Sequence, residues 1–331
     1  MKHLAYRPSP CSRAGFSRLD AIVLIGVCGF SIAMFASAVQ SSRTGCGRRM
    51  TCQYSLKQIA LATMQYANER QGRIPLLEDG RYGWPVALLP YLDSSALYRH
   101  LMGRPSDFDG SRDPEISRLQ LKILTCPQDT SNWHQALGLS YVANAGWGRF
   151  LVDEKTEAVT ESHPHSADVD WDEDGVVTAK ERWLTRATGV FWRAHADGYQ
   201  MTLDEIAEAD GLSQTILFAE NVNARNWLSR ETFDIGFVVG LDRIHFASDT
   251  DPARRFKVKS AKLGPFAIRP KPRVLPGRSP VPSSNHTGFF NIAFADGHVE
   301  SMNVNIDSRV YLQLMTHHGI VHGEPVIQSN P

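Results

Sequence analysis

The sequence predicts an α+β fold in which a long N-terminal helix, membrane-spanning in its first half, packs on an antiparallel β-sheet head with large loop insertions. Residues 21–42 carry no charged side chain, and as a helix they would be about 33 Å long, which matches a hydrocarbon core of roughly 30 Å. Residues 51–71 place apolar side chains at helical spacing. Residues 290–302 alternate around Asp296-Gly297, the pattern of a β-hairpin with a type I′ turn.

Composition narrows the classes of protein. The 331 residues include 35 basic and 35 acidic side chains, so the net charge gives no electrostatic reason to expect a nucleic-acid partner. Seven Trp, fifteen Phe and nine Tyr can supply a real core, which excludes a disordered stalk. Behind the apolar run, the chain is long enough for one large domain or two small ones.

The helix that follows the apolar run has one apolar face. That face comprises Leu56, Ile59, Ala60, Thr63 and Ala67. Lys57, Gln65 and Glu69 fall elsewhere on the helix, so we expect the apolar face to pack on the head. Gly72 and Pro75 follow as helix-ending residues.

Three further segments suggest regular structure in the head. Residues 83–103 combine a buried apolar run with a short helix capped near Asp93 or Ser94. Residues 121–127 are predicted to form a strand that runs into a turn, and residues 139–145 a second strand.

A processing signal precedes the apolar run. Gly15 is followed by Phe16, and a single acid, Asp20, lies at the edge of the run, where a charge beside lipid is costly without a partner. This arrangement resembles the processing and methylation site of type IV prepilins and pseudopilins. The resemblance implies cleavage between Gly15 and Phe16 by a prepilin peptidase. It also implies pairing of Asp20, which stands where the family usually has Glu, with a neighbouring subunit's N-terminus.

Two other interpretations of the N-terminus stay open. An ordinary secretory signal would use the basic residues before the run and a small-x-small site at residues 36–38. A plain signal anchor is the third option. We favour the prepilin-like interpretation because the apolar run is longer than the roughly 7–15 residues typical of a signal peptide. All three place most of the chain outside the cytoplasm.

Several separated segments resemble one family. They are residues 56–75 (LKQIALATMQYANERQGRIP), 83–92 (GWPVALLPYL), 124–127 (LTCP), 140–146 (SYVANAG), the block Asp210–Thr215 with Glu220, and His286 followed by Asp296-Gly297. In this order they resemble the planctomycete-type family catalogued as domain of unknown function 1559 (DUF1559), which begins with a prepilin-like N-terminus and closes with a His-x9-Asp-Gly motif. The resemblance implies a pilin-like head.

The resemblance and the patterns together set the expected domain boundaries. They are a leader at 1–15, a transmembrane helix at 16–42, a helix continuing onto the head at 43–72, and a periplasmic globular domain at 73–331, which includes a loop insertion at 168–186 and the hairpin motif at 283–302.

The closing motif is expected to be structural. His286 could cap or hydrogen-bond the hairpin that contains Asp296 and Gly297, and no nucleophile, base and orienting group accompany it in the sequence. Gly-rich phosphate loops, Gly-x-Ser-x-Gly, HExxH and CxxC are also missing from the sequence. We therefore expect no enzyme.

One segment has the spacing of a metal site. Residues 170–181 (DWDEDGVVTAKE) fit the Ca²⁺-loop pattern D-x-D-x-D-G-x5-E. The ligands would be Asp170, Asp172, Asp174, the Val176 carbonyl, Thr178 and Glu181. One flanking helix is expected, at residues 179–186. The alternative is an acidic surface turn with solvated carboxylates.

The cysteines and histidines give weaker signals. A Cys52–Cys126 bridge is one option, but Cys46 allows other pairings, and free buried thiols are equally compatible with the sequence. The remaining cysteines, Cys11 and Cys28, lie in the leader and the span. Five histidines lack Cys or acidic neighbours at metal spacing: His163, His165, His317, His318 and His322.

The expected function is structural. The chain would be a pilin- or pseudopilin-like protein of the inner membrane, with lipid, the prepilin peptidase and other pilin-like subunits as partners in a type II secretion or type IV pilus-like assembly. The alternative is a secreted or anchored ligand- or carbohydrate-binding module, which would expose several tryptophans. The candidates are Trp133, Trp147, Trp171, Trp183, Trp192 and Trp227.

Overall fold

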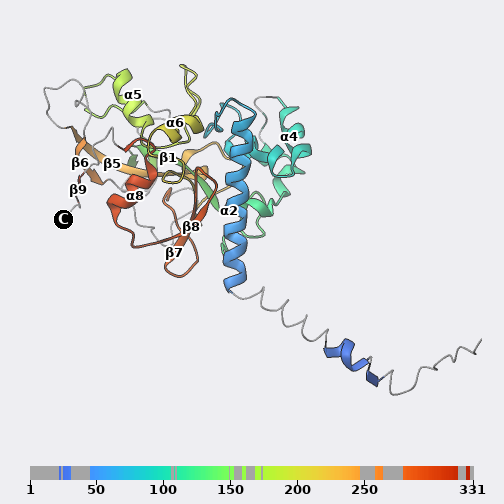
Figure 1. The fold of residues 1–331 in the computed structure, drawn as a ribbon. Helices are drawn as coiled ribbons and strands as arrows, with labels where there is room; N and C mark the ends of the chain where they lie inside the picture. The colour runs from blue at the N-terminus through green and yellow to red at the C-terminus, as the bar shows by residue number, and fades with distance from the viewer. Residues whose placement is uncertain are drawn as a thin grey trace, which may run out of the picture. The chain divides into compact units, whose positions relative to one another are not determined.

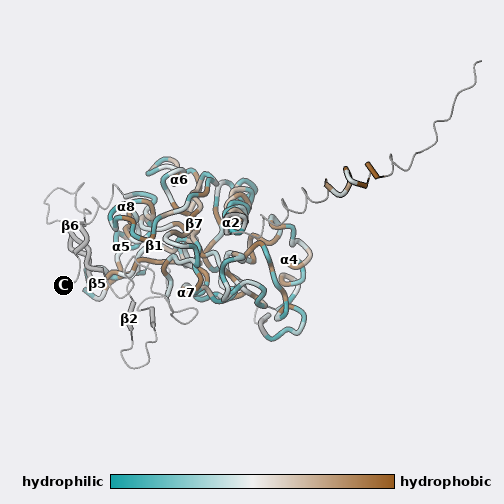
Figure 2. The backbone as a smooth tube through the Cα atoms, turned by 90° about the horizontal axis from the view of Figure 1, so that it is seen from below, coloured by the Kyte–Doolittle hydropathy of each residue, from teal (hydrophilic) through white to brown (hydrophobic). Residues whose placement is uncertain are grey.

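The computed structural model describes residues 22–23, 25–30, 45–105, 108, 110–148, 150–152, 159–161, 168–172, 174–246, 258–263, 279–319 and 326–328. The chain divides into two compact units, Met1–Arg48 and Arg49–Pro331. In the first unit, residues 22–23 and 25–30 are helical, and most of them are apolar (Figure 2). Among the described residues, no helix combines the length and the apolar character needed to cross a membrane. The predicted leader, the processing residues Gly15, Phe16 and Asp20, and most of the span at 16–42 lie outside the described residues.

A mixed sheet organises the second unit. Within the described part of the chain, seven strands lie in the order β8-β7-β4-β1-β5-β6-β9, and β2 and β3 form a separate pair. The strands are β1 Tyr141–Gly148, β2 Phe150–Val152, β3 Val159–Glu161, β4 Ile216–Glu220, β5 Gly236–Phe246, β6 Val258–Leu263, β7 Phe289–Phe294, β8 Val299–Asn303 and β9 Val326–Gln328.

The α+β class is confirmed, but the expectation of a purely antiparallel sheet is wrong. Strands β8, β7, β4 and β1 pair antiparallel, whereas β1 pairs parallel with β5 and β6 pairs parallel with β9. A parallel pair needs a long crossover connection, and the long segment between β1 and β5 provides one.

One long helix, α2, and several short helices pack around the sheet. The α-helices are α2 Gly45–Asn68, α3 Trp84–Leu88, α4 Ser95–Met102, α5 Ala179–Arg186, α6 Leu203–Glu208, α7 Thr232–Ile235 and α8 Ser308–Met315. The 3₁₀ helices are η1 Leu89–Tyr91, η2 Gly110–Arg112, η3 Ile116–Arg118 and η4 Lys122–Leu124.

Helix α2 buries the face that its sequence predicts. All five apolar-face positions between Leu56 and Ala67 are buried, while Lys57, Gln65 and Glu69 are exposed. The helix runs beside the β7–β8 hairpin (Figure 1), where the Gln53 amide donates to Ser301. Burial against the sheet therefore accounts for the amphipathic pattern.

The two faces of the sheet carry different helices. Successive residues of a strand point to opposite faces, so Tyr141 and Asn144 of β1 lie on different sides. The Tyr141 hydroxyl donates to the carbonyl of Cys52 in α2, and the Asn144 amide donates to the carbonyl of Met315 in α8. Helices α2 and α8 thus cover opposite faces of β1.

Two local predictions need correction. Residues 121–127 do not form a strand: Lys122–Leu124 is the 3₁₀ helix η4, and a short apolar run cannot distinguish these forms by its period. The hairpin is confirmed, but its turn is not type I′, because Gly297 has φ of 84° while Asp296 has no positive φ. The Gly297 amide donates to Phe294 O, and the Phe294 amide donates to His298 O, the pattern of a three-residue loop with a glycine bulge.

The short helix predicted within 83–103 is α4. Its N-cap is Ser94, which is one of the two residues predicted for this position. The Ser94 hydroxyl makes no capping hydrogen bond. It donates instead to the carbonyl of Leu92. The strand predicted at 139–145 is confirmed as β1.

Candidate functional site

Cys52 and Cys126 form a disulfide that joins α2 to the loop after η4, with Cα atoms 4.9 Å apart. Both cysteines are buried, and 74 positions separate them in the sequence. The bridge resolves the pairing that the sequence left open. Of the described cysteines, Cys28 is free and exposed.

A buried ionisable pair lies against this disulfide. Nε2 of His286 is 3.3 Å from Oε1 of Glu220, and it is 3.8 Å from Sγ of Cys126. Asn291 binds both carboxylate oxygens: its backbone N–H donates to Oε2 and its side-chain amide to Oε1, each at 2.9 Å. We call Cys52, Cys126, Glu220, His286 and Asn291 the buried cluster.

His286 meets two polar groups of the cluster. Its Nε2 is 3.3 Å from Oε1 of Glu220 and 3.3 Å from the side-chain nitrogen of Asn291, which itself donates to Oε1. Because a carboxylate only accepts, Nε2 donates to Oε1 in the tautomer that carries the ring proton on Nε2. The imidazole also stacks on the Phe289 ring, with centroids 4.9 Å apart. The side chains of Glu220 and His286 are each 2% exposed, so water does not screen the pair.

Hydrogen bonds continue from the cluster to the outer turns of α2. The Asn291 side-chain oxygen accepts from the Ser301 hydroxyl and the Gln53 amide. The Ser301 oxygen in turn accepts from Arg49, whose guanidinium lies 4.4 Å from the Phe289 ring centroid. Polar groups from α2, β7 and β8 are therefore joined in one network.

The charge of Glu220 also affects its surroundings. Burial holds the pKa of the Tyr141 hydroxyl well above its usual range, and the negative charge of Glu220 raises it further. Tyr141 stays protonated and can keep donating to the Cys52 carbonyl. A neutral Tyr141 thus supports α2 at the position of the disulfide.

The residues of the His-x9-Asp-Gly motif separate in space. His286 lies in the buried cluster, whereas Asp296 and Gly297 form the hairpin turn. A Cβ on Gly297 would lie 3.2 Å from Met64 Sδ and 3.4 Å from Leu61 Cδ2 of α2, at a positive φ. The motif therefore approaches α2 at two places, His286 near Cys52 and Gly297 near Leu61 and Met64. The structural role expected of His286 stays a prediction.

The acidic loop gathers three of its predicted ligands. One carboxylate oxygen from each of Asp170, Asp172 and Asp174 lies within 4.8 Å of the others. Although Asp172 is exposed, partial desolvation and then the neighbouring carboxylates of Glu181, Asp174 and Asp170 raise its pKa. Val176 is 60% exposed at the tip of the loop.

Two other predicted ligands are used by the flanking helix. Thr178 is the N-cap of α5, which spans Ala179–Arg186 as predicted, and Glu181 completes a capping box. Glu181 Oε2 accepts from the Thr178 amide at 2.9 Å, and Oε1 accepts from the Trp171 amide at 2.8 Å. In this conformation the Glu181 carboxylate joins the two ends of the loop by accepting from the backbone N–H groups of Trp171 and Thr178.

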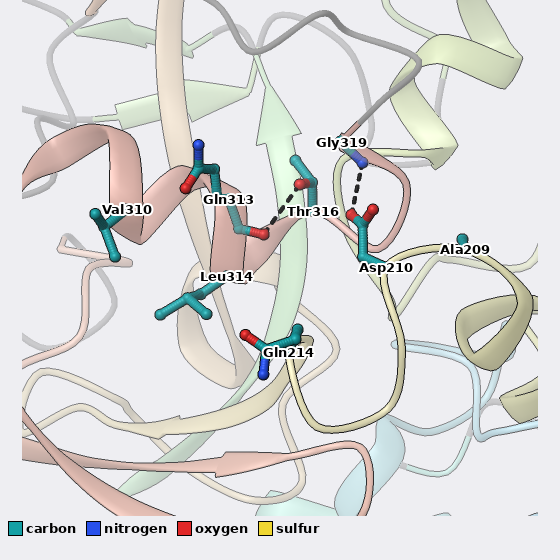
Figure 3. Close-up of a pocket in the computed structure, with 8 residues that line it drawn as sticks. All are labelled: Ala209, Asp210, Gln214, Val310, Gln313, Leu314, Thr316 and Gly319. Atoms are coloured by element: carbon teal, nitrogen blue, oxygen red, sulfur yellow. Dashed lines mark hydrogen bonds between the residues drawn. The ribbon is translucent and has the colours of Figure 1, made fainter.

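A pocket of about 450 Å³ lies between α8 and the loop before β4 (Figure 3). It is lined by Ala209, Asp210, Gln214, Val310, Gln313, Leu314, Thr316 and Gly319. The carboxylate of Asp210, the first residue of the Asp-Gly-x-Ser block, accepts from the Gly319 amide at 2.6 Å. Asp210 therefore connects the wall of the pocket to the segment after α8.

A binding module would expose several of the candidate tryptophans, but most of them lie in the core. Trp147, Trp171, Trp192 and Trp227 are at most 4% exposed, whereas Trp183 is 46% exposed. Trp133 is half-buried.

Among the described residues, neither His317 nor His318 belongs to a group of side chains that could hold a metal ion. His317 is buried and its Nδ1 lies 3.1 Å from the Gly189 carbonyl, while His318 is half-buried. His163, His165 and His322 lie outside the described residues.

Comparison with known proteins identifies the family. Residues 45–309 match the family described as "Protein of unknown function (DUF1559)". Because the match covers most of the chain, this protein belongs to the DUF1559 family. No curated protein and no solved structure matches the chain.

The sequence did not reveal the residues that hydrogen-bond around Glu220 and His286. Asn291 lies five residues after His286 in β7, and its side chain is buried. The signal that could have identified it is a polar amide at an inward-facing position of an alternating strand, because a buried amide needs hydrogen-bond partners. Gln53 and Ser301 gave no comparable signal, because each is a polar residue on an otherwise ordinary helix or strand.

Proposed function

We propose that this protein is a pilin- or pseudopilin-like structural subunit without catalytic activity. A prepilin-type peptidase removes residues 1–15, residues 16–42 hold the chain in the inner membrane, and the head lies in the periplasm. The protein then belongs to, or accompanies, a type II secretion or type IV pilus-like assembly, with other pilin-like subunits as partners.

The observation that carries this proposal is the attachment of α2 to the head. The disulfide holds Cys52, the hydrogen-bond network holds Arg49 and Gln53, and the hairpin turn packs against Leu61 and Met64. A subunit whose N-terminal helix is packed among other subunits must transmit force from that helix to its head. Covalent and buried polar links prevent the helix from sliding along the sheet.

The first test is mass spectrometry of the mature N-terminus, using protein from membranes of the native host. We expect a chain that starts at Phe16 with an N-methyl group. A start at Val39 would indicate a cleaved secretory signal and overturn the proposal, and an intact Met1 would leave only a membrane anchor.

A matched pair of variants sharpens the test. Gly15→Val should block cleavage, because it changes the residue on the leader side of the proposed cut. Gly29→Val makes the same change inside the apolar run and should be processed normally. Equal processing of the two variants would place the cut elsewhere.

The proposal includes a structural Ca²⁺ ion at residues 170–181. The three gathered aspartates and the raised pKa of Asp172 support it, since a cation would relieve the repulsion among these carboxylates. Glu181 would have to leave its capping contacts to provide the last ligand, and any bound ion would order the loop without supplying a catalytic water.

Calorimetry on the full-length protein tests the ion. We expect a dissociation constant of about 10⁻⁴–10⁻³ M, as for extracellular modules, and its loss in Asp172→Asn. Asp204→Asn, which neutralises an exposed acid on α6, should bind as the unchanged protein does. No heat of binding, or equal binding by both variants, would contradict the proposal.

The alternative function, a ligand- or carbohydrate-binding module, has less support. Such a module needs exposed aromatic side chains to stack on its ligand, and four of the six candidate tryptophans are in the core. Trp183 remains as an exposed aromatic residue of the described head.

A further inference from the structure

The buried cluster contains more ionisable groups than a structural disulfide requires. One ligand atom from each of Cys52, Cys126, Glu220 and His286 lies within 4.8 Å of the other three, and all four residues are buried. Burying a carboxylate and an imidazole carries a desolvation cost that their mutual contact often fails to recover. A disulfide alone does not explain why both groups lie within 4.8 Å of its sulfurs.

We propose that reduction of the Cys52–Cys126 disulfide converts these four residues into a closed tetrahedral Zn²⁺ site. Its ligands are the two cysteine thiolates, Nε2 of His286 and one oxygen of Glu220. This proposal goes beyond the structural role described above and does not depend on pilus-like assembly.

The reaction balances with a phosphine as reductant. The phosphine takes up one oxygen from water and supplies two electrons, the S–S bond breaks, and the two protons of that water produce two thiols. Zn²⁺ then displaces both thiol protons into solution. Nε2 of His286 binds the metal through its lone pair, with the ring proton on Nδ1.

The distances already present fit such a site. Zn²⁺ binds sulfur at about 2.3 Å and nitrogen or oxygen at about 2.0–2.1 Å, which places tetrahedral N and O ligands about 3.3 Å apart and S and N ligands about 3.6 Å apart. Nε2 of His286 is 3.3 Å from Oε1 of Glu220 and 3.8 Å from Sγ of Cys126. Once the S–S bond is broken, side-chain rotation has to bring the two sulfurs to a separation of about 3.8 Å.

The type of donor and its surroundings favour zinc. Thiolate, imidazole and carboxylate together are ligands of Zn²⁺, whereas Ca²⁺ and Mg²⁺ prefer oxygen alone. Asn291 holds both oxygens of Glu220, and Phe289 stacks on the His286 ring, so two ligands are oriented by neighbours. Because the ligands are buried, the site leaves no open position for water and the metal would be structural.

The consequence is an alternative cross-link. Under oxidising conditions the disulfide joins α2 to the loop at Cys126, and under reducing conditions Zn²⁺ joins the same two residues. Oxidation forms the S–S bond and releases the metal, so the two cross-links exclude each other.

The test uses the full-length chain with Cys11, Cys28 and Cys46 changed to Ser, which leaves one pair of thiols. The chain is reduced with a phosphine in denaturant and refolded without oxygen in the presence of Co²⁺, a spectroscopic substitute for Zn²⁺. We expect stoichiometric uptake, a thiolate-to-cobalt charge-transfer band, and intense tetrahedral d–d bands that disappear when Zn²⁺ is added. The oxidised chain should show none of these.

Variants identify the two ligands that are not cysteines. His286→Ala and Glu220→Gln should each weaken binding by at least about 100-fold, because even residues that only orient a ligand typically contribute 10–100-fold. The matched controls are His298→Ala and Glu300→Gln on the same hairpin, where neither residue belongs to the cluster; both should bind normally. Circular dichroism of each oxidised variant checks that it folds.

Four results would overturn the proposal. They are no cobalt uptake by the reduced chain, equal uptake by the oxidised chain, uptake that is insensitive to His286 and Glu220, and failure of the reduced chain to refold with Zn²⁺.

Discussion

The disulfide offers the sharpest test of how the head is stabilised. Cys52→Ala combined with Cys126→Ala removes a link across 74 positions of sequence. In the chain-entropy relation, a loop of this size gives about 4.5 kcal/mol at 25 °C, since the cross-link limits the unfolded chain. We expect the oxidised parent to exceed the double variant in free energy of unfolding by about that amount.

Guanidinium unfolding followed by tryptophan fluorescence measures this difference. Trp84, Trp147 and Trp227 are fully buried, so their emission should shift when the head unfolds. With a slope of about 6 kcal/mol/M, the midpoint should fall by roughly 0.75 M. Cys28→Ser, which removes an exposed free thiol, should leave the midpoint unchanged. A loss below about 1 kcal/mol would refute the reasoning, because it would mean that the unfolded chain gains little freedom when the link is cut.

Three further changes test the core. Asn291→Ala removes the amide that supports the buried carboxylate and should destabilise the head by about 3 kcal/mol, whereas Asn305→Ala at an exposed position should have little effect in the same denaturation assay. Gly146→Ala should lower the stability of the head more than Gly198→Ala does. Both glycines have a positive φ, but a Cβ at position 146 would lie 2.7–3.0 Å from neighbouring atoms, whereas one at position 198 would meet nothing within 4 Å. Equal melting temperatures of the two variants would contradict this. Burial lowers the pKa of His317 to about 4, so the unfolded chain binds the proton more readily and stability should fall by about 3 kcal/mol between pH 6.5 and pH 4. His317→Gln should flatten that part of the pH profile, and an unchanged profile would exclude His317 as its cause.

Local patterns predicted the elements that depend on nearby residues. The buried face of α2, the extent of α5 and the hairpin around Gly297 all follow from residue types and spacing within a few residues. The strand expected at 121–127 failed because a short apolar run fits several backbones, and here the chain turns so that Cys126 reaches α2.

The candidate site was predicted only in part, because its residues are far apart in the sequence. His286 and Glu220 were singled out as motif residues, but they are 66 positions apart, and nothing in either segment indicates that they meet. Their contact depends on the strand order, which places β4 beside β7 and brings Asn291 under the carboxylate.

By itself, the sequence determined the family, the α+β class, the amphipathic helix and the acidic loop, because each is encoded by residue type and short spacing. The tertiary structure decided that Cys52 pairs with Cys126 and that a buried histidine and glutamate lie against this bridge. These features arise when distant segments pack together, and the burial that results sets both the strength of their interactions and the choice of partner.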